Sequence, residues 1–399
     1  MRFKRNTEGG ITVQRNREYA DGSVEFDARQ NRVDEHFMRM TLREAMKGTG
    51  FVSPNPLVGA IAVKGEQVLG KAHHKKFGDA HAEIVLLEKL DAAQVRGATI
   101  YVNLEPCCHM GKTPPCTDAL IRAGVSRVVV GHEDPNPLVG GKGIAQLRAA
   151  GIHVAVGVLE PEARTLNAPF LVYMTQGRPW ILLKVAQSLD GRIALANGQS
   201  RWITGDKSRT EVHRLRAQLD AVMVGSQTVL EDDPELTVRH VSGRDPLRII
   251  VDSKLRISPK AKVLAQADRG RTWILITADA PHEKQSKIAE TGAALITCPA
   301  GEDGKVDLHA AMKQLAERNV TSLFVEGGGT LHASFIRAGL YDKFIVAIAA
   351  KLIGADGRPA IWDLELTDLA QMPQFVIRRN RRVGKDIWLE LERDVYGNR

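Results

Sequence analysis

One histidine, one glutamate and two cysteines stand in an order that can bind zinc and activate water. His81 and Glu83 form an H-x-E pair, and Cys107 and Cys116 follow, each directly after a proline. Imidazole nitrogen and thiolate sulfur are good zinc ligands, and three protein ligands leave the fourth position open for water. Glu83 is not needed as a ligand, so it is free to move protons. This set is typical of zinc-dependent deaminases, in which metal-bound hydroxide attacks an amino-bearing ring carbon.

The neighbouring residues predict elements that can position these side chains. Residues 98–104 (ATIYVNL) have the composition of a buried strand, which delivers Cys107 just beyond its end. Cys116 opens an amphipathic helix that ends at Gly124, and His81 begins another helical pattern. The common deaminase signature has two residues between its cysteines, whereas here residues 108–115 (CHMGKTPP) intervene.

Other interpretations of these residues remain open. A closed, purely structural zinc site would need a fourth protein ligand, for which His109 is the candidate. The cysteines could instead be a redox pair or two buried thiols, and the adjacent thiol of Cys108 could replace that of Cys107. Cys298 lies in the apolar run 293–298 and is predicted to be a core residue.

Length and composition indicate a cytoplasmic protein of two domains. A chain of 399 residues exceeds one ordinary core, and its mean hydropathy of −0.19 fits globular domains. Neither a membrane span nor a signal peptide is apparent. Four cysteines are too few for a disulfide framework. The net charge of +8 suits an anionic partner, either nucleic acid or a small phosphorylated molecule.

The order of the predicted elements gives an α/β fold class for both domains. Residues 1–33 are basic and poor in apolar groups, which indicates a flexible, solvated extension or an RNA-binding arm. From Asp34 the pattern α-β-β-α-β-α-β-α-β predicts a sheet covered by helices, closed by one helix over residues 161–174. The boundary is placed at residues 177–178. A second α/β pattern runs to the end and finishes in three strands near residues 344–349, 374–379 and 387–391.

A glycine-rich turn is the best local clue in the second half. Residues 322–330 (SLFVEGGGT) read as a strand, three glycines and the start of a helix. Backbone N–H groups at such a helix N-terminus can approach phosphates. A tight turn without a ligand explains the same pattern.

The first half resembles the deaminase part of the bifunctional riboflavin-biosynthesis deaminase–reductases. The resemblance rests on residues 54–59 (PNPLVG), on His74 with the H-x-E pair, and on residues 104–116 (LEPCCHMGKTPPC). It implies a cytidine-deaminase-like α/β/α sandwich with one zinc ion held by His81, Cys107 and Cys116. It also implies pyrimidine contacts from Asn55 and His74, and Lys112 is a candidate substrate contact.

The second half resembles the reductase part of the same family through residues 184–192 (KVAQSLDGR), 200–204 (SRWIT) and 228–239 (TVLEDDPELTVR). That part has a dihydrofolate-reductase-like fold and uses NADPH. Carried over by position, the cofactor site would comprise Ala186, Trp202, Thr228, Asp232, Ser253 and the segment 328–334, with Gly328, Gly329 and Thr330. Lys254 or Arg256 could meet a 2′-phosphate. The substrate site would comprise Ser200, Arg216, Leu236, Arg239 and Glu326.

The resemblance implies two successive reactions. The first domain (34–177) would deaminate 2,5-diamino-6-ribosylamino-4(3H)-pyrimidinone 5′-phosphate, with Glu83 as the proton carrier. The second domain (178–399) would reduce the ribosyl group to ribityl with NADPH, with Lys184 polarising the sugar and Asp232 or Glu326 handling the proton. The expected partner is this small phosphorylated pyrimidine, without nucleic acid or membrane, and a homo-oligomer is compatible with the sequence. The competing hypothesis is a polynucleotide deaminase with an unrelated C-terminal binding domain.

Overall fold

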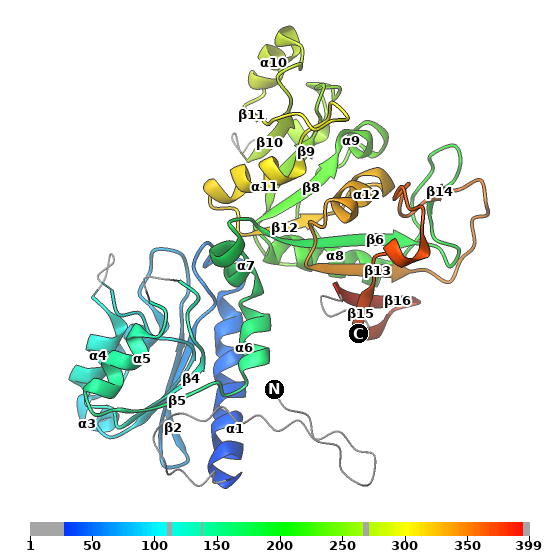
Figure 1. Ribbon diagram of the computed structural model, residues 1–399. Coiled ribbons are helices and arrows are strands. Elements are labelled where there is room, and N and C mark those ends of the chain that lie inside the picture. The colour runs from blue at the N-terminus through cyan, green and yellow to red at the C-terminus, as the bar shows by residue number, and fades with distance from the viewer. Residues whose placement is uncertain (1–27, 110–113, 137–138, 266–270, 394–399) are drawn as a thin grey trace.

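The computed structural model describes residues 28–109, 114–136, 139–265 and 271–393, and it forms two lobes that meet around helix α7 (Figure 1). Lys112 lies outside the described residues, as do residues 1–27. No helix in the described ranges is long and apolar enough to cross a membrane.

The first lobe is a five-stranded sheet with helices on both faces. Its strand order is β2-β1-β3-β4-β5, where β1 pairs antiparallel with β2 and β3, and the pairs β3–β4 and β4–β5 are parallel. The strands are β1 (Gly59–Lys64), β2 (Gln67–His73), β3 (Thr99–Leu104), β4 (Arg127–His132) and β5 (His153–Val156). The helices are α1 (Ala28–Ala45), α2 (Ala82–Glu88), α3 (Ala92–Val95), α4 (Cys116–Ala123) and α5 (Lys142–Ala149).

Alternation along the strands builds a core on each face of this sheet. On β3, Ile100 and Val102 pack in one cluster, whereas Tyr101 packs in the other with Phe37 of α1. Tyr101 Oη donates to Asp34 Oδ1 at 2.9 Å, and this carboxylate also pairs with Arg127 at 2.7 Å. These bonds fix α1 across the sheet.

Two boundaries of the first lobe differ from the sequence predictions. Helix α1 begins at Ala28 rather than at Asp34, so residues 28–33 are not part of a flexible extension. The reason is that Val33 packs against the core around Phe37. The single helix predicted over 161–174 is two helices, α6 (Glu160–Leu166) and α7 (Ala168–Gln176). Pro169 has no N–H to continue the first helix.

The second lobe is built on a nine-stranded sheet of order β11-β10-β9-β8-β12-β6-β13-β16-β15. It is parallel from β11 to β13, and β16 pairs antiparallel with β13 and β15. The strands in chain order are β6 (Trp180–Gln187), β8 (Ala221–Gly225), β9 (Leu247–Val251), β10 (Thr272–Ile276), β11 (Ala294–Thr297), β12 (Ser322–Val325), β13 (Lys343–Ile348), β15 (Phe375–Val383) and β16 (Asp386–Arg393). Two short strands, β7 (Arg192–Ala194) and β14 (Arg358–Pro359), pair separately and were not predicted.

The helices of the second lobe are α8 (Asp206–Gln218), α9 (Ser226–Asp232), α10 (His282–Ala289), α11 (Leu308–Glu317) and α12 (Gly329–Arg337). Cys298 is 2% exposed in the core beneath α11, which confirms its predicted place. The final three strands confirm the prediction that the chain ends in β structure without long intervening helices.

Candidate active sites in the two lobes

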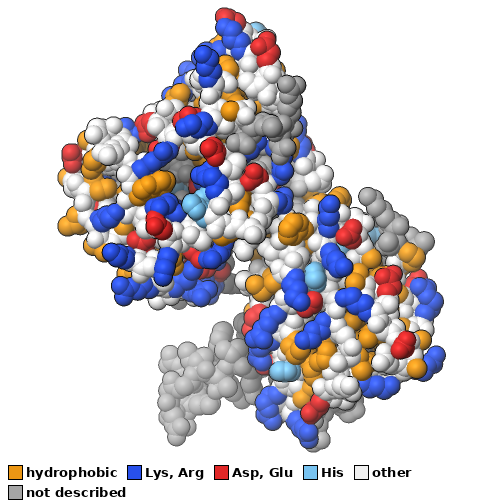
Figure 2. All heavy atoms as spheres, turned by 180° about the vertical axis from the view of Figure 1, so that it is seen from behind, with side chains coloured by type: hydrophobic (Ala, Val, Ile, Leu, Met, Phe, Trp, Pro, Cys, Tyr) orange, Lys and Arg blue, Asp and Glu red, His pale blue; other side chains and the backbone are white. Residues whose placement is uncertain are grey.

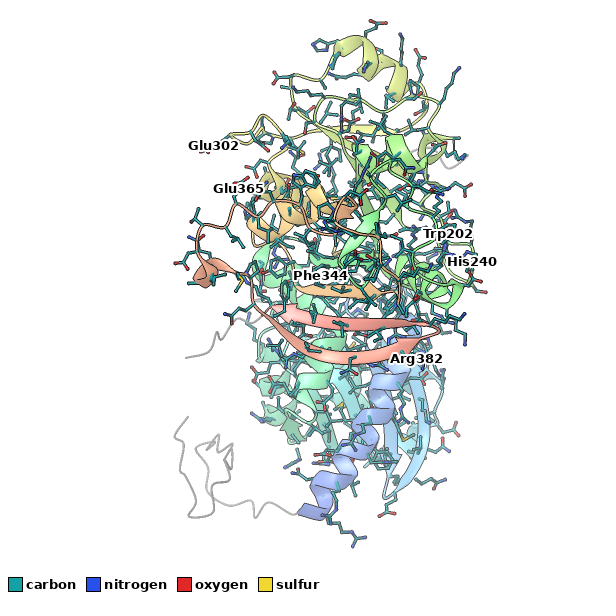
Figure 3. All side chains as sticks on the ribbon, turned by 90° about the vertical axis from the view of Figure 1, so that its right-hand side faces the viewer. Trp202, His240, Glu302, Phe344, Glu365 and Arg382 are labelled. Atoms are coloured by element: carbon teal, nitrogen blue, oxygen red, sulfur yellow. The ribbon has the colours of Figure 1, made fainter. Side chains whose placement is uncertain are left out.

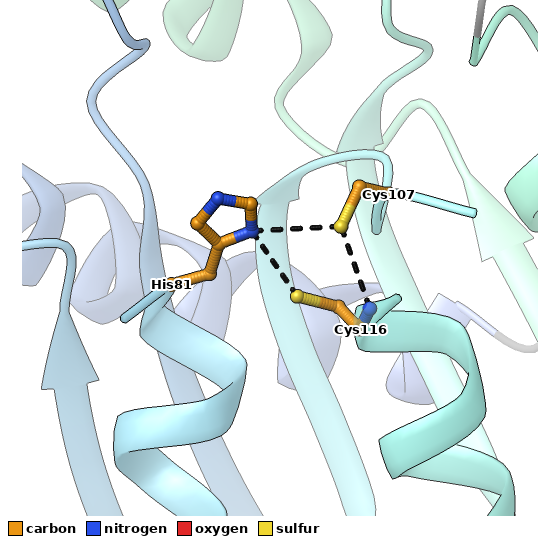
Figure 4. A group of neighbouring side chains, drawn as sticks. All are labelled: His81, Cys107 and Cys116. Carbon is orange, nitrogen blue, oxygen red and sulfur yellow. Dashed lines mark hydrogen bonds between the residues drawn. The ribbon is translucent and has the colours of Figure 1, made fainter. Parts of the chain in front are cut away.

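His81, Cys107 and Cys116 form one group in the first lobe (Figure 4). His81 Nδ1 lies 3.3 Å from Cys116 Sγ and 3.5 Å from Cys107 Sγ, and the backbone N–H of Cys116 lies 3.4 Å from Cys107 Sγ. All three ligand atoms lie within 4.8 Å of one another. Cys107 belongs to this group, and Cys108 does not.

The three ligand residues lie at the ends of three secondary-structure elements. His81 precedes α2, Cys116 opens α4, and Cys107 follows β3. Glu105 holds the loop after β3, because its carboxylate accepts from the backbone N–H of Gly141 at 2.9 Å and of Ile144 at 3.1 Å.

Gly143 allows the start of α5 to approach this loop closely. A Cβ at Gly143 would lie 2.2 Å from the carbonyl oxygen of Pro106, so any larger residue would displace the segment that carries Cys107. The local turn therefore depends on α5 as well as on the cysteine motif.

One nitrogen and two sulfurs at these separations fit a zinc ion, and the donor set is one that zinc prefers. Among the described residues, the group contains no fourth His, Cys, Asp or Glu, and His109 is exposed outside it. A set of three protein ligands is typical of catalytic rather than structural zinc. This geometry favours the catalytic interpretation of the motif.

Glu83 is buried beside the ligand group. Its side chain is 3% exposed, and burial, followed by the nearby Cys107 thiolate, raises its pKa to about 7. Hydrogen bonding to Cys116 lowers the pKa of Cys107 to about 4. A carboxyl group with a pKa near neutrality can both accept and return a proton.

Asn55 and His74 meet next to the ligand group. Asn55 Nδ2 lies 3.1 Å from His74 Nε2, and the His74 ring packs edge-on against His81 with centroids 5.7 Å apart. Burial lowers the pKa of His74, so the neutral ring is favoured at neutral pH. Asp134, which no sequence motif indicates, is a further titratable group near Cys107: burial raises its pKa to about 6, with Glu105 and Cys107 adding to the shift.

The second lobe contains a cleft of about 1480 Å³ at the carboxyl ends of its parallel strands. Predicted cofactor residues that line it are Ala186, Thr228, Asp232, Ser253, Gly328, Gly329 and Thr330, and Lys254 and Arg256 line it as well. Trp202 does not belong to this cleft. It lines a neighbouring cleft and is 61% exposed, which also excludes a core role.

The glycine turn before α12 gives the larger cleft room for a phosphate-bearing ligand. A Cβ at Gly328 would meet only Thr228 Oγ1, at 3.8 Å, and would project into the cleft. A Cβ at Gly329 would lie 2.7 Å from the carbonyl oxygen of Pro359. The turn thus opens the N-terminus of α12 toward the cleft, which suits the pyrophosphate of a dinucleotide.

The neighbouring cleft, of about 660 Å³, contains all five predicted substrate residues: Ser200, Arg216, Leu236, Arg239 and Glu326. Arg216 and Glu326 form a two-pronged ion pair, with Nε to Oε1 at 2.6 Å and Nη2 to Oε2 at 2.9 Å. Arg216 Nη1 also donates to the Thr237 carbonyl oxygen at 3.0 Å. This pairing holds the Arg216 fork at the floor of the cleft.

The two clefts share a wall. Residues that line both are Lys184, Ala186, Ile193, Ser200, Thr228, Asp232 and Glu326. Burial lowers the pKa of Lys184 to about 8, although the charge of Glu326 opposes this effect. Figure 3 places Glu302 and Glu365 of the larger cleft on one side of this lobe and Trp202 and His240 of the smaller cleft on the other.

Three histidines near the shared wall belong to no motif in the sequence. His213 accepts from the backbone N–H of Arg239 at 3.1 Å and packs edge-on against His240, with centroids 4.5 Å apart. Burial lowers the pKa of His213 to about 4, and it has the same effect on fully buried His332. Their only signal in the sequence is the residue type, because no motif reveals the packing of helices α8 and α12, which carry His213 and His332, or of the loop that carries His240.

Each lobe matches the model of a known protein family. Residues 31–132 match the family model for the cytidine and deoxycytidylate deaminase zinc-binding region, and residues 179–389 match the RibD C-terminal domain. The chain is 42% identical over 371 residues to the riboflavin biosynthesis protein RibD of Escherichia coli, covering 90% of this chain and 99% of that one. The corresponding Aquifex aeolicus protein is 41% identical over 362 residues, again covering 90% and 99%.

Solved structures agree over nearly the whole length. RibD of Acinetobacter baumannii (form 1) superposes with a TM-score of 0.82 at 36% identity, covering 91% of this chain and 99% of that one. A Thermotoga maritima diaminohydroxyphosphoribosylaminopyrimidine deaminase/5-amino-6-(5-phosphoribosylamino)uracil reductase superposes with a TM-score of 0.81 at 36% identity and the same coverage.

Proposed function

Because the chain belongs to the RibD family of bifunctional riboflavin-biosynthesis enzymes, we propose how its two sites divide the deaminase and reductase reactions. The first lobe is the zinc-dependent deaminase and the second is the NADPH-dependent reductase. The competing hypothesis of a polynucleotide deaminase is wrong, because the C-terminal half matches a reductase domain rather than an unrelated binding domain.

The observation that carries the deaminase assignment is the open three-ligand group beside buried Glu83. His81, Cys107 and Cys116 would hold zinc, which when bound supplies a water molecule activated for attack on the ring. Glu83 would take up one proton of that water and deliver it to the ring nitrogen, and would then carry the second proton to the leaving amine. Asn55 and neutral His74 would orient the pyrimidine by hydrogen bonds.

The reductase assignment depends on the wall shared by the two clefts. NADPH in the larger cleft would supply hydride to the ring-opened sugar in the smaller one. Gly328, Gly329 and Thr330 would receive the pyrophosphate, and Ala186, Thr228, Asp232 and Ser253 would line the rest of the cofactor. Trp202 is expected at the cofactor from the sequence. Because it lines the smaller cleft, it would instead contact the substrate or the rim of that cleft.

Charge in the smaller cleft supports a phosphorylated substrate. Its lining contains six Lys and Arg residues against four Asp and Glu residues, and Arg216 is already paired with Glu326. Arg239 is the better candidate for the ribosyl phosphate, because its own ion pair with Glu235, at 2.7 Å, is exposed to solvent whereas that of Arg216 is buried, and because planar guanidinium groups bind phosphate with two hydrogen bonds. Leu236 and Ser200 would complete the pyrimidine and sugar contacts.

We further propose that the chain acts on this small molecule in the cytoplasm, without a nucleic-acid partner, and that it can form a homo-oligomer. On the face drawn in Figure 2, Lys and Arg side chains spread over both lobes with Asp and Glu among them, which does not resemble a continuous basic groove.

The decisive experiment supplies the diaminopyrimidine ribosyl phosphate to zinc-loaded protein and follows ammonia, then adds NADPH and follows its absorbance. Ammonia release followed by NADPH oxidation that requires the deaminated product is expected. NADPH oxidation by the undeaminated substrate at an equal rate would contradict the order of the two reactions.

A further inference from the structure

The loop that carries Asn55 in the deaminase lobe touches the reductase lobe directly. Ser53 Oγ donates to Asp220 Oδ2 at 2.7 Å and lies 3.1 Å from Thr321 Oγ1. Asp220 connects α8 to β8, and Thr321 immediately precedes β12. The loop after α1 is therefore hydrogen-bonded to the framework of the other catalytic half.

A second contact holds the same loop. Gly50 has a φ of +85°, and a Cβ there would lie 2.6 Å from the carbonyl oxygen of Ala217, in the last turn of α8. Only glycine combines this backbone conformation with such a close approach. The contact at Gly50 lies just before the turn that leads to Asn55, and the contact at Ser53 lies within it.

Two backbone hydrogen bonds connect the anchored loop to the deaminase site. The Asn55 N–H donates to the Val52 carbonyl oxygen at 2.9 Å, and the Phe77 N–H donates to the Phe51 carbonyl oxygen at 3.1 Å. The first bond fixes the turn that presents Asn55 to His74. The second joins the loop to the segment that leads to His81.

Asp220 is itself rigidly held within the reductase lobe. Its Oδ2 atom also accepts from the Thr321 N–H at 3.0 Å and the Thr321 hydroxyl at 2.7 Å, and Arg244 donates to Oδ1 at 2.9 Å. The carboxylate is thus a fixed acceptor whose position does not depend on Ser53. A fixed acceptor can position a more mobile loop.

We propose that Asp220 of the reductase half, acting through Ser53, is a positioning residue for deamination, because it holds the loop that places Asn55 against the pyrimidine. The inference rests on the proposed substrate contact of Asn55. It follows that the deaminase site of this chain is completed by its reductase domain, and that the two halves are mechanically joined at this point.

The test measures kcat and KM for ammonia release in the full-length, zinc-loaded chain. Ser53→Ala should raise KM for the diaminopyrimidine ribosyl phosphate by about three- to tenfold, which lies within the range expected for the net loss of one typical hydrogen bond. Its kcat should stay within about twofold, and Ser53→Thr, which keeps the hydroxyl, should restore KM. Reduction of separately supplied deaminated product should be unchanged in Ser53→Ala.

Ser126→Ala is the matched control, because Ser126 Oγ donates to backbone oxygens within the deaminase lobe, at Gly97 and Ala98, away from the interface. Its KM should equal that of the unmodified chain. In a double-mutant cycle, Ser53→Ala combined with Asp220→Ala should raise KM no further than Asp220→Ala alone, since each change removes the same hydrogen bond.

Three results would overturn the inference. One is an unchanged KM in Ser53→Ala while Asn55→Ala raises KM. Another is a KM in Ser126→Ala that rises as much as in Ser53→Ala. The third is additive effects in the double-mutant cycle. If Asn55→Ala itself has no effect on KM, the proposed role of Asn55 is wrong, and the inference built on it falls with it.

Discussion

Replacing Lys184 by methionine should abolish sugar reduction and at the same time stabilise the reductase lobe. Lys184 lies half-buried on the wall between the two clefts. Burial lowers its pKa from 10.5 to about 8, and at 1.36 kcal/mol for each pKa unit this difference corresponds to about 3 kcal/mol. Since part of the side chain still faces the solvent of the clefts, we expect a measured gain of about 1–3 kcal/mol.

The pH dependence follows from the direction of the shift. Below about pH 8 the lysine is charged in both the folded and the unfolded chain, so the folded state bears the full cost of the buried charge. Between about 8 and 10.5 the folded chain releases the proton while the unfolded chain keeps it, and the cost disappears. The stabilisation by Lys184→Met should therefore be largest near neutral pH and absent near about pH 10.5.

Calorimetry can measure this stabilisation. The unfolding transition of the reductase lobe is identified as the one whose melting temperature rises when NADPH is added. Lys262→Met is the control, because Lys262 lines the same smaller cleft but is 60% exposed, and its removal should change the free energy of unfolding by less than about 0.5 kcal/mol. A lower melting temperature for Lys184→Met at neutral pH, or a gain of equal size at both pH values, would refute the reasoning. In the unmodified chain, kcat/KM for reduction should fall as the pH rises through about 8, because we propose that the charged form of the lysine polarises the sugar oxygen.

Three further outcomes are expected. Arg216→Met should lower the free energy of unfolding by about 3 kcal/mol in denaturant titrations, since it leaves the buried Glu326 carboxylate without its partner, and Glu326→Gln in that background should recover part of the loss. Glu83→Gln should eliminate ammonia release while zinc content and NADPH oxidation with deaminated substrate remain unchanged; loss of zinc would show that Glu83 is structural. Gly328→Val should raise KM for NADPH about tenfold or more, because the valine side chain would occupy the cleft. The backbone can accept valine, since Gly328 has a φ of −72° that any residue adopts. An unchanged KM would place the cofactor elsewhere.

The zinc site was predictable because its residues lie in local motifs. His81 and Glu83 are separated by one residue, and Cys107 and Cys116 flank a single loop between a strand and a helix. Strands β3 and β12 were also predictable, since each is a short, largely apolar run bounded by turn residues. The break between α6 and α7 had a sequence signal in Pro169 that the helical pattern obscured.

The pairings in the reductase lobe could not be read in the same way. Arg216 and Glu326 were both assigned to the substrate, yet they are 110 residues apart and meet only because β12 lies beside β8, to which the chain returns directly after α8. His213 and His332 likewise acquire their positions from sheet order. Sequence separation of this size leaves the partner of a charged side chain undetermined until the topology is known.

The pairing of Glu326 narrows the choice of proton carrier in the reductase. Glu326 accepts both prongs of Arg216, and this interaction together with Lys184 lowers its pKa despite burial. A carboxylate held in its charged form has no proton to give to a sugar oxygen. We therefore assign Glu326 the task of fixing Arg216 and keeping Lys184 charged near neutrality, since without it burial would lower the pKa of Lys184 further. Asp232, which accepts from the Ser200 hydroxyl at 3.1 Å, lies on the same wall. We propose Lys184 as the proton carrier, because its pKa of about 8 leaves it charged at neutral pH and still able to lose the proton.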